Sequence, residues 1–235
     1  MPVKTSRQTF ILVIPAYNEE KYIEKTILAW AKSLDGFPGS EILVINDGST
    51  DKTPEILNLL SNKFHAVNII HKKNEGHGKT ILLGYQKAVE SLHDWVFQTD
   101  GDGHFDPNDF NKLWRKRISS DFILGHRKLR ADSAARIALS NFASFWIYIL
   151  FGLYIKDPNI PFRLIKRTYL EGILKRIPKT VFAPNMFLSI LAAKDGQKLH
   201  HIPVKHALRK KHDNQLKLFR GGMRTFFELL LFSLF

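Results

Sequence analysis

The sequence predicts an α/β domain built on a mostly parallel β-sheet with helices on both faces. Two features of the sequence indicate this fold class. Short apolar runs rich in β-branched residues recur over the first 125 residues, and segments with helical periodicity separate them. The runs are continuous rather than alternating, which is typical of strands covered on both faces. Strands that alternate with helices pair in parallel through crossover connections, so a single layered sheet is expected.

The predicted elements follow in order along the chain. Strands are expected at residues 9–14, 41–46, 67–70, 95–99 and 122–125. Helices are expected at about 22–30, from Thr50 or Asp51 to about 62, at 79–91, and from near Pro107. With 235 residues, of which 44% are hydrophobic, the chain can form one sizeable domain with an appendage. We assign residues 1–215 to the main domain and 216–235 to a C-terminal contact helix.

The formal net charge of +13 favours anionic partners, which include nucleic acid, phosphorylated substrates and an anionic membrane surface. Basic residues gather at 115–117, 127–130 and 209–211. Two of these clusters adjoin the most apolar segments, which favours a membrane surface over nucleic acid. The chain contains no cysteine, so disulfides and thiolate metal sites are excluded.

Polar clusters follow four of the predicted strands, at 18–19, 47–49, 74–78 and 100–104. The carboxyl ends of parallel strands meet at one edge of a sheet, where ligands bind, and a nucleotide is the natural ligand there. Asp47 could accept hydrogen bonds from a base or ribose. Asp100 and Asp102 could hold a divalent cation that bridges diphosphate oxygens. The alternative is that these residues only form polar turns.

Two other ligand-binding loops do not fit this sequence. An EF-hand requires glycine at the sixth loop position and glutamate at the twelfth, where counting from Asp100 gives Phe105 and Asn111. Residues 76–80 resemble a P-loop, but Lys73 stands where its first glycine is required.

Four segments carry a resemblance to a known family: VIPAYNEE at 13–20, VINDGSTD at 44–51, NEGHG at 74–78 and QTDGD at 98–102. Weaker matches lie at 125–127, 157–164 and 202–209. In these motifs the chain resembles the inverting family 2 glycosyltransferases of GT-A fold. It is most similar to the branch of dolichyl-phosphate mannosyltransferase and bacterial polyprenyl-phosphate glycosyltransferases.

The resemblance implies a GT-A (Rossmann-like) fold and roles for matching residues. The nucleotide-sugar would be bound by Pro15, Ala16, Tyr17, Glu19, Asp47, Gly76 and Asp100. Asp100, Asp102 and His104 would hold Mg²⁺ or Mn²⁺, histidine being more usual for Mn²⁺. Donor or acceptor phosphates would meet Arg127, Arg136, Ser140, Arg163 and Arg209. The catalytic set would be Asp100, Asp102, Asp157 and Arg127. Departures from the family pattern, such as His126 and Ile160-Pro161, leave the sugar and the acceptor open.

The expected reaction moves a sugar from a nucleotide-diphosphate-sugar onto a polyprenyl (dolichyl or undecaprenyl) phosphate at the cytoplasmic membrane face. A phosphate nucleophile is already anionic and needs cations rather than a general base. A saccharide or lipid hydroxyl acceptor would instead need a carboxylate base, for which Asp157 is the candidate. A basic membrane-binding protein with a non-catalytic nucleotide site is the alternative from another class.

Two apolar segments raise the question of a membrane. Residues 137–155 contain no charged residue and could just cross a bilayer, but a crossing would separate Arg136 from Asp157. We therefore expect a helix lying at the membrane interface, with a buried core helix as the alternative. Residues 226–235 are too short to span, and Glu228 interrupts them. This tail is expected to dock on the membrane surface, or otherwise on a second copy or a membrane protein, which makes the protein peripheral.

Overall fold

A seven-stranded sheet runs through the computed structural model, which describes residues 8–127, 134–207 and 215–234. Its strand order is β3-β2-β1-β4-β6-β5-β7. The strands are β1 (Phe10–Ala16), β2 (Glu41–Asp47), β3 (Val67–Lys72), β4 (Trp95–Gln98), β5 (Phe122–Arg127), β6 (Arg163–Lys166) and β7 (His200–Val204). Only β6 runs antiparallel to its neighbours, β4 and β5. The mostly parallel sheet predicted from the sequence is confirmed.

All five predicted strands are present, and the structure adds β6 and β7. Neither of the added strands has a continuous apolar run, which is why the sequence pattern did not reveal them. The four residues of β6 include Arg163 and Lys166, and β7 contains two histidines and Pro203.

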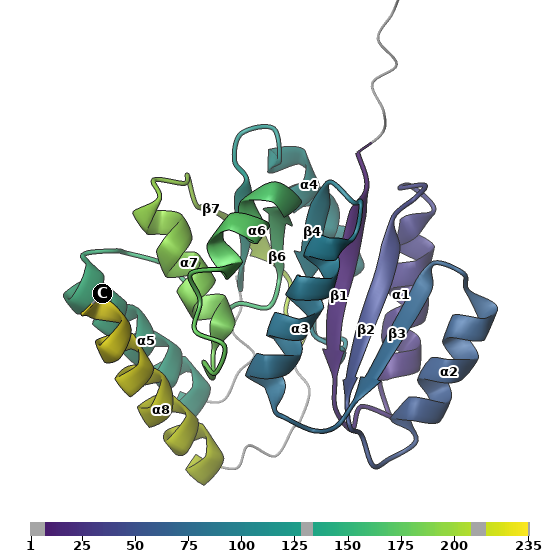
Figure 1. The fold of residues 1–235 in the computed structure, drawn as a ribbon, viewed down its shortest axis with the longest axis horizontal. Helices are drawn as coiled ribbons and strands as arrows, with labels where there is room; N and C mark the ends of the chain where they lie inside the picture. The colour runs from purple at the N-terminus through teal and green to yellow at the C-terminus, as the bar shows by residue number, and fades with distance from the viewer. Residues whose placement is uncertain (1–7, 128–133, 208–214, 235) are drawn as a thin grey trace, which may run out of the picture.

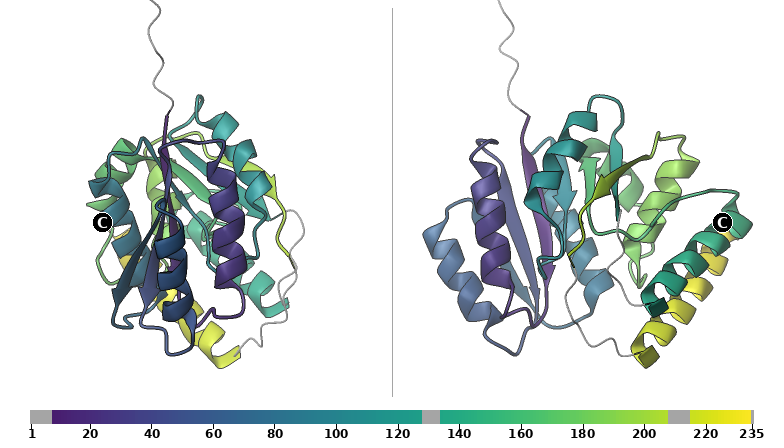
Figure 2. Two further views of the ribbon diagram at one scale, coloured as in Figure 1. Left: turned by 90° about the vertical axis from the view of Figure 1, so that its right-hand side faces the viewer. Right: turned by 180° about the vertical axis from the view of Figure 1, so that it is seen from behind.

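Helices cover both faces of the sheet. In Figure 1, α3, α6 and α7 lie on the face toward the viewer, and α1 and α4 cover the opposite face (Figure 2). The helices are α1 (Ile23–Leu34), α2 (Thr53–Lys63), α3 (His77–Glu90), the 3-10 turn η1 (Pro107–Asp109), α4 (Phe110–Lys116), α5 (Ala134–Phe151), α6 (Arg167–Leu174), α7 (Pro184–Lys194) and α8 (Gln215–Ser233). Prolines in the first turns of α2 and α7 fit helix starts, where no intrahelical N–H bond is lost.

Helices α5 and α8 pack along each other beside α7, away from the sheet (Figure 1). The ring of Phe226 lies 4.7 Å from Trp146 and 6.1 Å from Phe142, measured between centroids. The apolar helix expected at 137–155 ends earlier, at Phe151, because Gly152 adopts a left-handed φ of 67°. Ile147 alone is fully buried among the α5 side chains that the structure describes, so the core-helix alternative does not hold.

A buried cation ties the centre of the sheet to its surroundings. Arg163 on β6 is fully buried, and its guanidinium donates five hydrogen bonds. The acceptors are the carbonyls of Pro158, Ile160 (twice) and Asn185, at 2.6–3.2 Å, and Ser189 Oγ at 3.3 Å. Burial lowers the pKa of Arg163 to about 10, so the group stays charged at neutral pH. Arginine has five N–H donors, and all are used here.

The expectation that Arg163 meets a phosphate is therefore corrected. Its side chain is closed off from solvent and has no donor left for a ligand. It holds Asn185 instead, whose side-chain amide donates to Gln98 Oε1 at 3.0 Å and whose Oδ1 accepts from Tyr85 at 2.8 Å. Gln98 is the last residue of β4, two positions before Asp100. The network thus supports the loop that follows β4.

We predict that Arg163→Met lowers the free energy of unfolding by about 3 kcal/mol or more, because three backbone carbonyls lose their buried donors. Urea denaturation monitored by circular dichroism would measure this loss. Arg167→Met is the matched control: Arg167 is partly exposed and donates from Nε to the His93 carbonyl at 2.9 Å. A loss no larger than in this control would contradict the assigned role of Arg163.

Candidate functional site

Loops at the carboxyl ends of β1, β2 and β4 enclose a cavity of about 390 Å³, called here the strand-end cavity. Its lining consists of Pro15, Ala16, Tyr17, Glu19, Asp47, Asn74, Gly76, His77, Thr80, Asp100, Gly101 and Asp102. Every residue expected to bind the nucleotide-sugar lies in this lining. The structure brings the residues together, and their roles in binding stay predictions. Asn74, His77 and Thr80 were not assigned a role from the sequence, although the first two belong to the 74–78 motif.

The loops after β1 and β2 are joined by side-chain caps. Asn18 adopts a left-handed φ of 53°, and its Oδ1 accepts a hydrogen bond from the Thr50 N–H at 2.8 Å. Thr53 Oγ1 accepts from the Glu19 N–H at 2.9 Å. These bonds fix the segment that carries Tyr17 and Glu19 at the cavity wall. The Tyr17 ring is 47% exposed and therefore open to stacking by a planar ligand.

Asp47 closes one side of the strand-end cavity. Its carboxylate accepts hydrogen bonds from Lys72 Nζ at 2.5 Å and from the N–H groups of Glu75 and Gly76 at 3.0 Å. Burial raises the pKa of Asp47, but the hydrogen bonds from Lys72 and the loop outweigh burial and hold the pKa below its ordinary value. Asp47 is thus an ionised residue that holds the 73–76 loop in place, a function that the sequence did not indicate.

The turn between Asp100 and Asp102 directs both carboxylates at the same cavity. A Cβ at Gly101 would lie 3.1 Å from Ile23 Cδ1 and 3.2 Å from the Pro15 carbonyl, so the turn packs closely on β1. Gln98 Nε2 lies 3.5 Å from Asp100 Oδ1, and Asp102 Oδ1 accepts from the His104 N–H at 3.2 Å. Two carboxylates at one cavity suit a hard divalent cation that takes its remaining ligands from phosphate or water.

His104 lies beside Asp102, and its role as a third metal ligand stays a prediction. His104 Nε2 faces Asp102 Oδ2 at 3.4 Å, while its ring packs against that of His206 at a centroid distance of 4.8 Å. Within residues 8–127, 134–207 and 215–234 no three acidic, histidine or cysteine side chains form a group that could hold a metal. Asp100 and Asp102 both line the strand-end cavity, and their role as metal ligands stays a prediction. His206 is a neighbour that the sequence did not point to, since it lies far along the chain.

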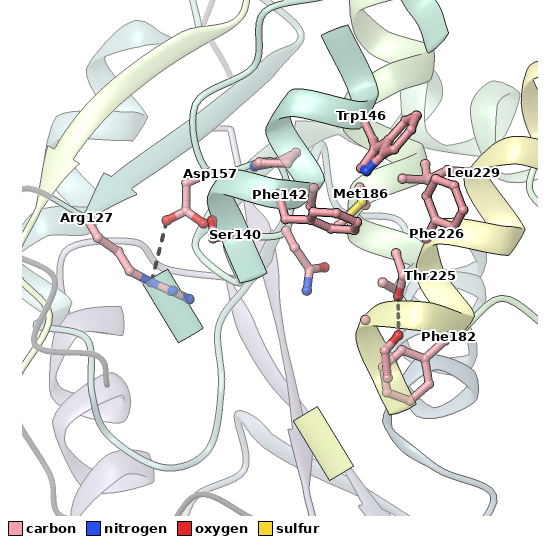
Figure 3. Close-up of a pocket in the computed structure, with 16 residues that line it drawn as sticks. Arg127, Ser140, Phe142, Trp146, Asp157, Phe182, Met186, Thr225, Phe226 and Leu229 are labelled. Atoms are coloured by element: carbon pink, nitrogen blue, oxygen red, sulfur yellow. Dashed lines mark hydrogen bonds and ion pairs between the residues drawn. The ribbon is translucent and has the colours of Figure 1, made fainter. Parts of the chain in front are cut away.

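A second cavity of about 280 Å³ lies between α5, α8 and the start of α7, and we call it the helix cavity (Figure 3). Arg127, Ser140 and Asp157 lie toward one end of it, and the rest is largely apolar. Its walls include Phe142, Ala143, Trp146, Phe182, Met186, Phe226 and Leu229. The cavity can therefore take a molecule with a polar end and a hydrocarbon part.

Arg127 and Asp157 face each other at the polar end of the helix cavity. Arg127 Nε lies 3.6 Å from Asp157 Oδ2, and Arg127 is the last residue of β5 (Figure 3). Asp157 is only 4% exposed and has a left-handed φ of 49°, which an aspartate tolerates better than most residues. The pair fixes the guanidinium beside the cavity, where an anion could bind to it.

Two expected phosphate contacts cannot be located. Arg209 lies outside the described residues, and for Arg136 only the backbone, within α5, is described. Ser140 lines the helix cavity as expected, and Arg163 is buried as reported above. Among the helices that the structure describes, none combines the length and apolarity needed to cross a bilayer.

Solved structures of low sequence identity share this fold. Glucosyl-3-phosphoglycerate synthase from Mycobacterium tuberculosis, in complex with Mn²⁺, UDP-glucose and phosphoglyceric acid, has a TM-score of 0.72 at 14% identity. The match covers 96% of this chain and 80% of that one. The chain thus has the GT-A fold that the motifs implied.

Curated relatives match over almost the whole chain. The UDP-N-acetylglucosamine–dolichyl-phosphate N-acetylglucosaminyltransferase of Methanococcus voltae is 24% identical over 95% of both chains. The undecaprenyl-phosphate mannosyltransferase of Micrococcus luteus is 23% identical over 91% of this chain and 88% of its own length. The family model described as Glycosyl transferase family 2 matches residues 11–188, which include the whole strand-end cavity. The chain therefore belongs to family 2 of the glycosyltransferases.

Proposed function

We propose that this protein is an inverting, metal-dependent transferase that moves a sugar from a nucleotide-diphosphate-sugar to a polyprenyl phosphate. The observation that carries the proposal is the helix cavity, with an arginine at its polar end and an apolar interior. A phosphate ester of a long hydrocarbon matches both parts. The two relatives named above, whose names specify dolichyl phosphate and undecaprenyl phosphate, support the same acceptor class.

The donor would bind in the strand-end cavity. Tyr17 would stack on the base, and the loop held by Asp47 would form the wall beside the ribose and phosphates. The UDP-sugar ligand of the mycobacterial synthase and the UDP-sugar in the name of the M. voltae relative support a donor of this class.

Asp100 and Asp102 would hold the divalent cation, Mg²⁺ or Mn²⁺, and the Mn²⁺ of the mycobacterial structure supports such a cofactor. When bound, the cation supplies positive charge to offset the charge of the departing diphosphate. The cavity needs that charge, because Glu19, Asp47, Asp100 and Asp102 line it and would otherwise repel an anionic donor.

The reaction joins two anions. An oxygen of the acceptor phosphate forms a bond to the anomeric carbon, while the bond from that carbon to the diphosphate oxygen breaks and its electron pair leaves with the nucleoside diphosphate. The attacking oxygen is already charged, so no group of this chain has to remove a proton. Arg127 would bind the acceptor phosphate and reduce its repulsion from the donor.

The acceptor requires access from a bilayer, and the outer faces of α5 and α8 suit the membrane surface. Their exposed side chains include Phe145, Tyr148, Ile149, Phe227 and Leu231, with Leu234 directly after α8 and Arg220 and Arg224 nearby. Apolar side chains next to basic ones favour an anionic leaflet, which is why we infer peripheral binding at the cytoplasmic face.

Asp102→Asn is expected to lower transfer at least a hundredfold while leaving the melting temperature within a few degrees. The amide keeps an oxygen for the His104 N–H but loses the charge that a cation needs. Asp121→Asn, which alters an exposed ion pair with Lys166, is the control. Full turnover by the unaltered protein in excess chelator would contradict metal dependence.

A donor and acceptor screen tests the proposed function itself. We expect turnover of a nucleotide-sugar such as UDP-N-acetylglucosamine or GDP-mannose only when undecaprenyl or dolichyl phosphate and Mg²⁺ or Mn²⁺ are present. Release of nucleoside diphosphate, together with a glycolipid detected by mass spectrometry, is the readout. Transfer to a free saccharide or to a polyprenol lacking the phosphate would instead indicate a hydroxyl acceptor and a role for Asp157 as base.

The triple variant Phe227→Ser/Leu231→Ser/Leu234→Ser is expected to bind anionic phosphatidylglycerol vesicles at least tenfold more weakly. Each substitution removes about 2 kcal/mol of apolar burial in the membrane. These side chains are 54%, 61% and 73% exposed, so the fold does not depend on them. The control is the triple variant Leu59→Ser/Leu92→Ser/Ile118→Ser, whose residues are also exposed but lie on α2 and in two loops away from α8. Equal sedimentation of both triple variants would refute docking through α8.

A further inference from the structure

Glu228 is the one acidic residue in the sequence of α8, and the reaction proposed above does not use it. Its carboxylate is largely covered, and it accepts hydrogen bonds from the Phe182 N–H at 2.8 Å and from Arg224 Nε at 2.9 Å. Arg224 also donates from Nη2 to the Thr180 carbonyl at 2.8 Å. The pair therefore binds the backbone of residues 180–182, which precede α7, to a helix that is otherwise apolar or basic.

Glycines on two helices allow close packing around the same segment. On α8, a Cβ at Gly221 would lie 2.9 Å from Cε1 of the Phe182 ring, and the Arg224 guanidinium lies 5.5 Å from that ring. On α3, a Cβ at Gly78 would lie 2.5 Å from the Val181 carbonyl oxygen and 2.6 Å from that of Phe182. Residues 181–182 are thus held between α8 and the first turn of α3, with no room for a side chain at either glycine.

This segment connects the two cavities. Gly76, His77 and Thr80, at the start of α3, line the strand-end cavity. Phe182 lines the helix cavity together with Gly221, Thr225 and Leu229 of α8. Figure 3 shows the Phe182 ring beside Thr225, below the apolar part of the helix cavity. A shift of residues 180–182 would therefore move one wall of each cavity relative to the other.

We propose that Glu228 and Arg224 are positioning residues, which fix residues 180–182 and so set the separation between the acceptor in the helix cavity and the donor in the strand-end cavity. The inference rests on the proposed function. Reacting atoms must lie within about 3–3.5 Å of each other, and a misplacement of about 1 Å can lower the rate about a hundredfold. A contact that joins both cavity walls can therefore control transfer without touching either substrate.

The simpler alternative is that the two residues form only an i,i+4 ion pair that stabilises α8. A charge swap separates the two interpretations. The double variant Arg224→Glu/Glu228→Arg keeps an ion pair on the helix surface, but it removes the acceptor for the Phe182 N–H and the donor to the Thr180 carbonyl. The variant Glu228→Leu removes the acceptor while making α8 more apolar, so that loss of transfer cannot result from weaker membrane binding.

Amide hydrogen exchange of the full chain without ligands is the first measurement. We expect peptides covering 178–183 and 76–81 to exchange at least tenfold faster in Glu228→Leu and in the charge swap than in the unaltered protein. Glu171→Leu is the matched control, because Glu171 of α6 also forms an i,i+4 ion pair, with Lys175 directly after the helix. Faster exchange confined to α8 peptides, or protection restored by the charge swap, would overturn the proposal.

The second measurement is the rate of sugar transfer on anionic vesicles. The acceptor is undecaprenyl phosphate, and the donor is UDP-N-acetylglucosamine or GDP-mannose, whichever the screen identifies. Both variants should show kcat/KM for the acceptor at least tenfold lower than the Glu171→Leu control, with vesicle binding retained. If the charge-swap variant had the same kcat/KM as the unaltered protein, the ion pair within α8 alone would explain the role of the two residues, and the proposal would be overturned. If the unaltered protein transfers no sugar, the proposed function fails, while hydrogen exchange still decides whether Glu228 holds the two cavity walls together.

Discussion

The buried guanidinium of Arg163 is the contact on which the arrangement of the site depends. It binds the carbonyls that follow Asp157 and the first turn of α7, and through Asn185 it reaches Gln98 at the end of β4. These segments carry Asp157, a wall of the helix cavity, and the loop with Asp100. A buried charge with every donor satisfied tolerates little displacement, because each lost bond leaves a polar group without a partner. The segments that carry Asp157, the start of α7 and the end of β4 are therefore anchored to one buried group in the core.

The two cavities differ in charge, although the chain as a whole is strongly basic. Acidic side chains line the strand-end cavity, and Lys72 forms an ion pair with one of them, Asp47. The helix cavity instead has the ion pair of Arg127 and Asp157 at its polar end. In the proposed reaction a bound cation would offset these carboxylates for an anionic donor, whereas Arg127 would donate charged hydrogen bonds to an anionic acceptor. This difference fits the proposal that the donor, rather than the acceptor, is bound through a metal.

The sequence predicted the part of the structure that depends on local patterns. Continuous apolar runs identified five strands, and their polar ends identified the strand-end cavity, because parallel strands bring those ends to one edge. Local sequence patterns did not predict the features that depend on contacts between residues far apart in the chain. Arg163 lies in a motif suggestive of phosphate binding, yet the fold turns it inward, and the closeness of His206 to His104 arises only when β7 joins β5. Nothing in the local sequence shows that Glu228 reaches Phe182, 46 residues away.

The two long helices, finally, fit the proposal that the acceptor and the membrane meet at one surface. Helix α5 has apolar side chains on more than one side: Trp146 faces the helix cavity, whereas Tyr148 and Ile149 are exposed. Helix α8 also has apolar side chains on more than one side, because Phe226 lines the helix cavity and Phe227 is exposed. A helix that is apolar on opposite sides needs two apolar environments. The helix cavity is one of them, and a bilayer would be the other. If the helices dock in this way, the hydrocarbon of an acceptor can pass from the bilayer into the helix cavity without entering water. Exposing a long hydrocarbon chain to water costs free energy, and this arrangement avoids that cost.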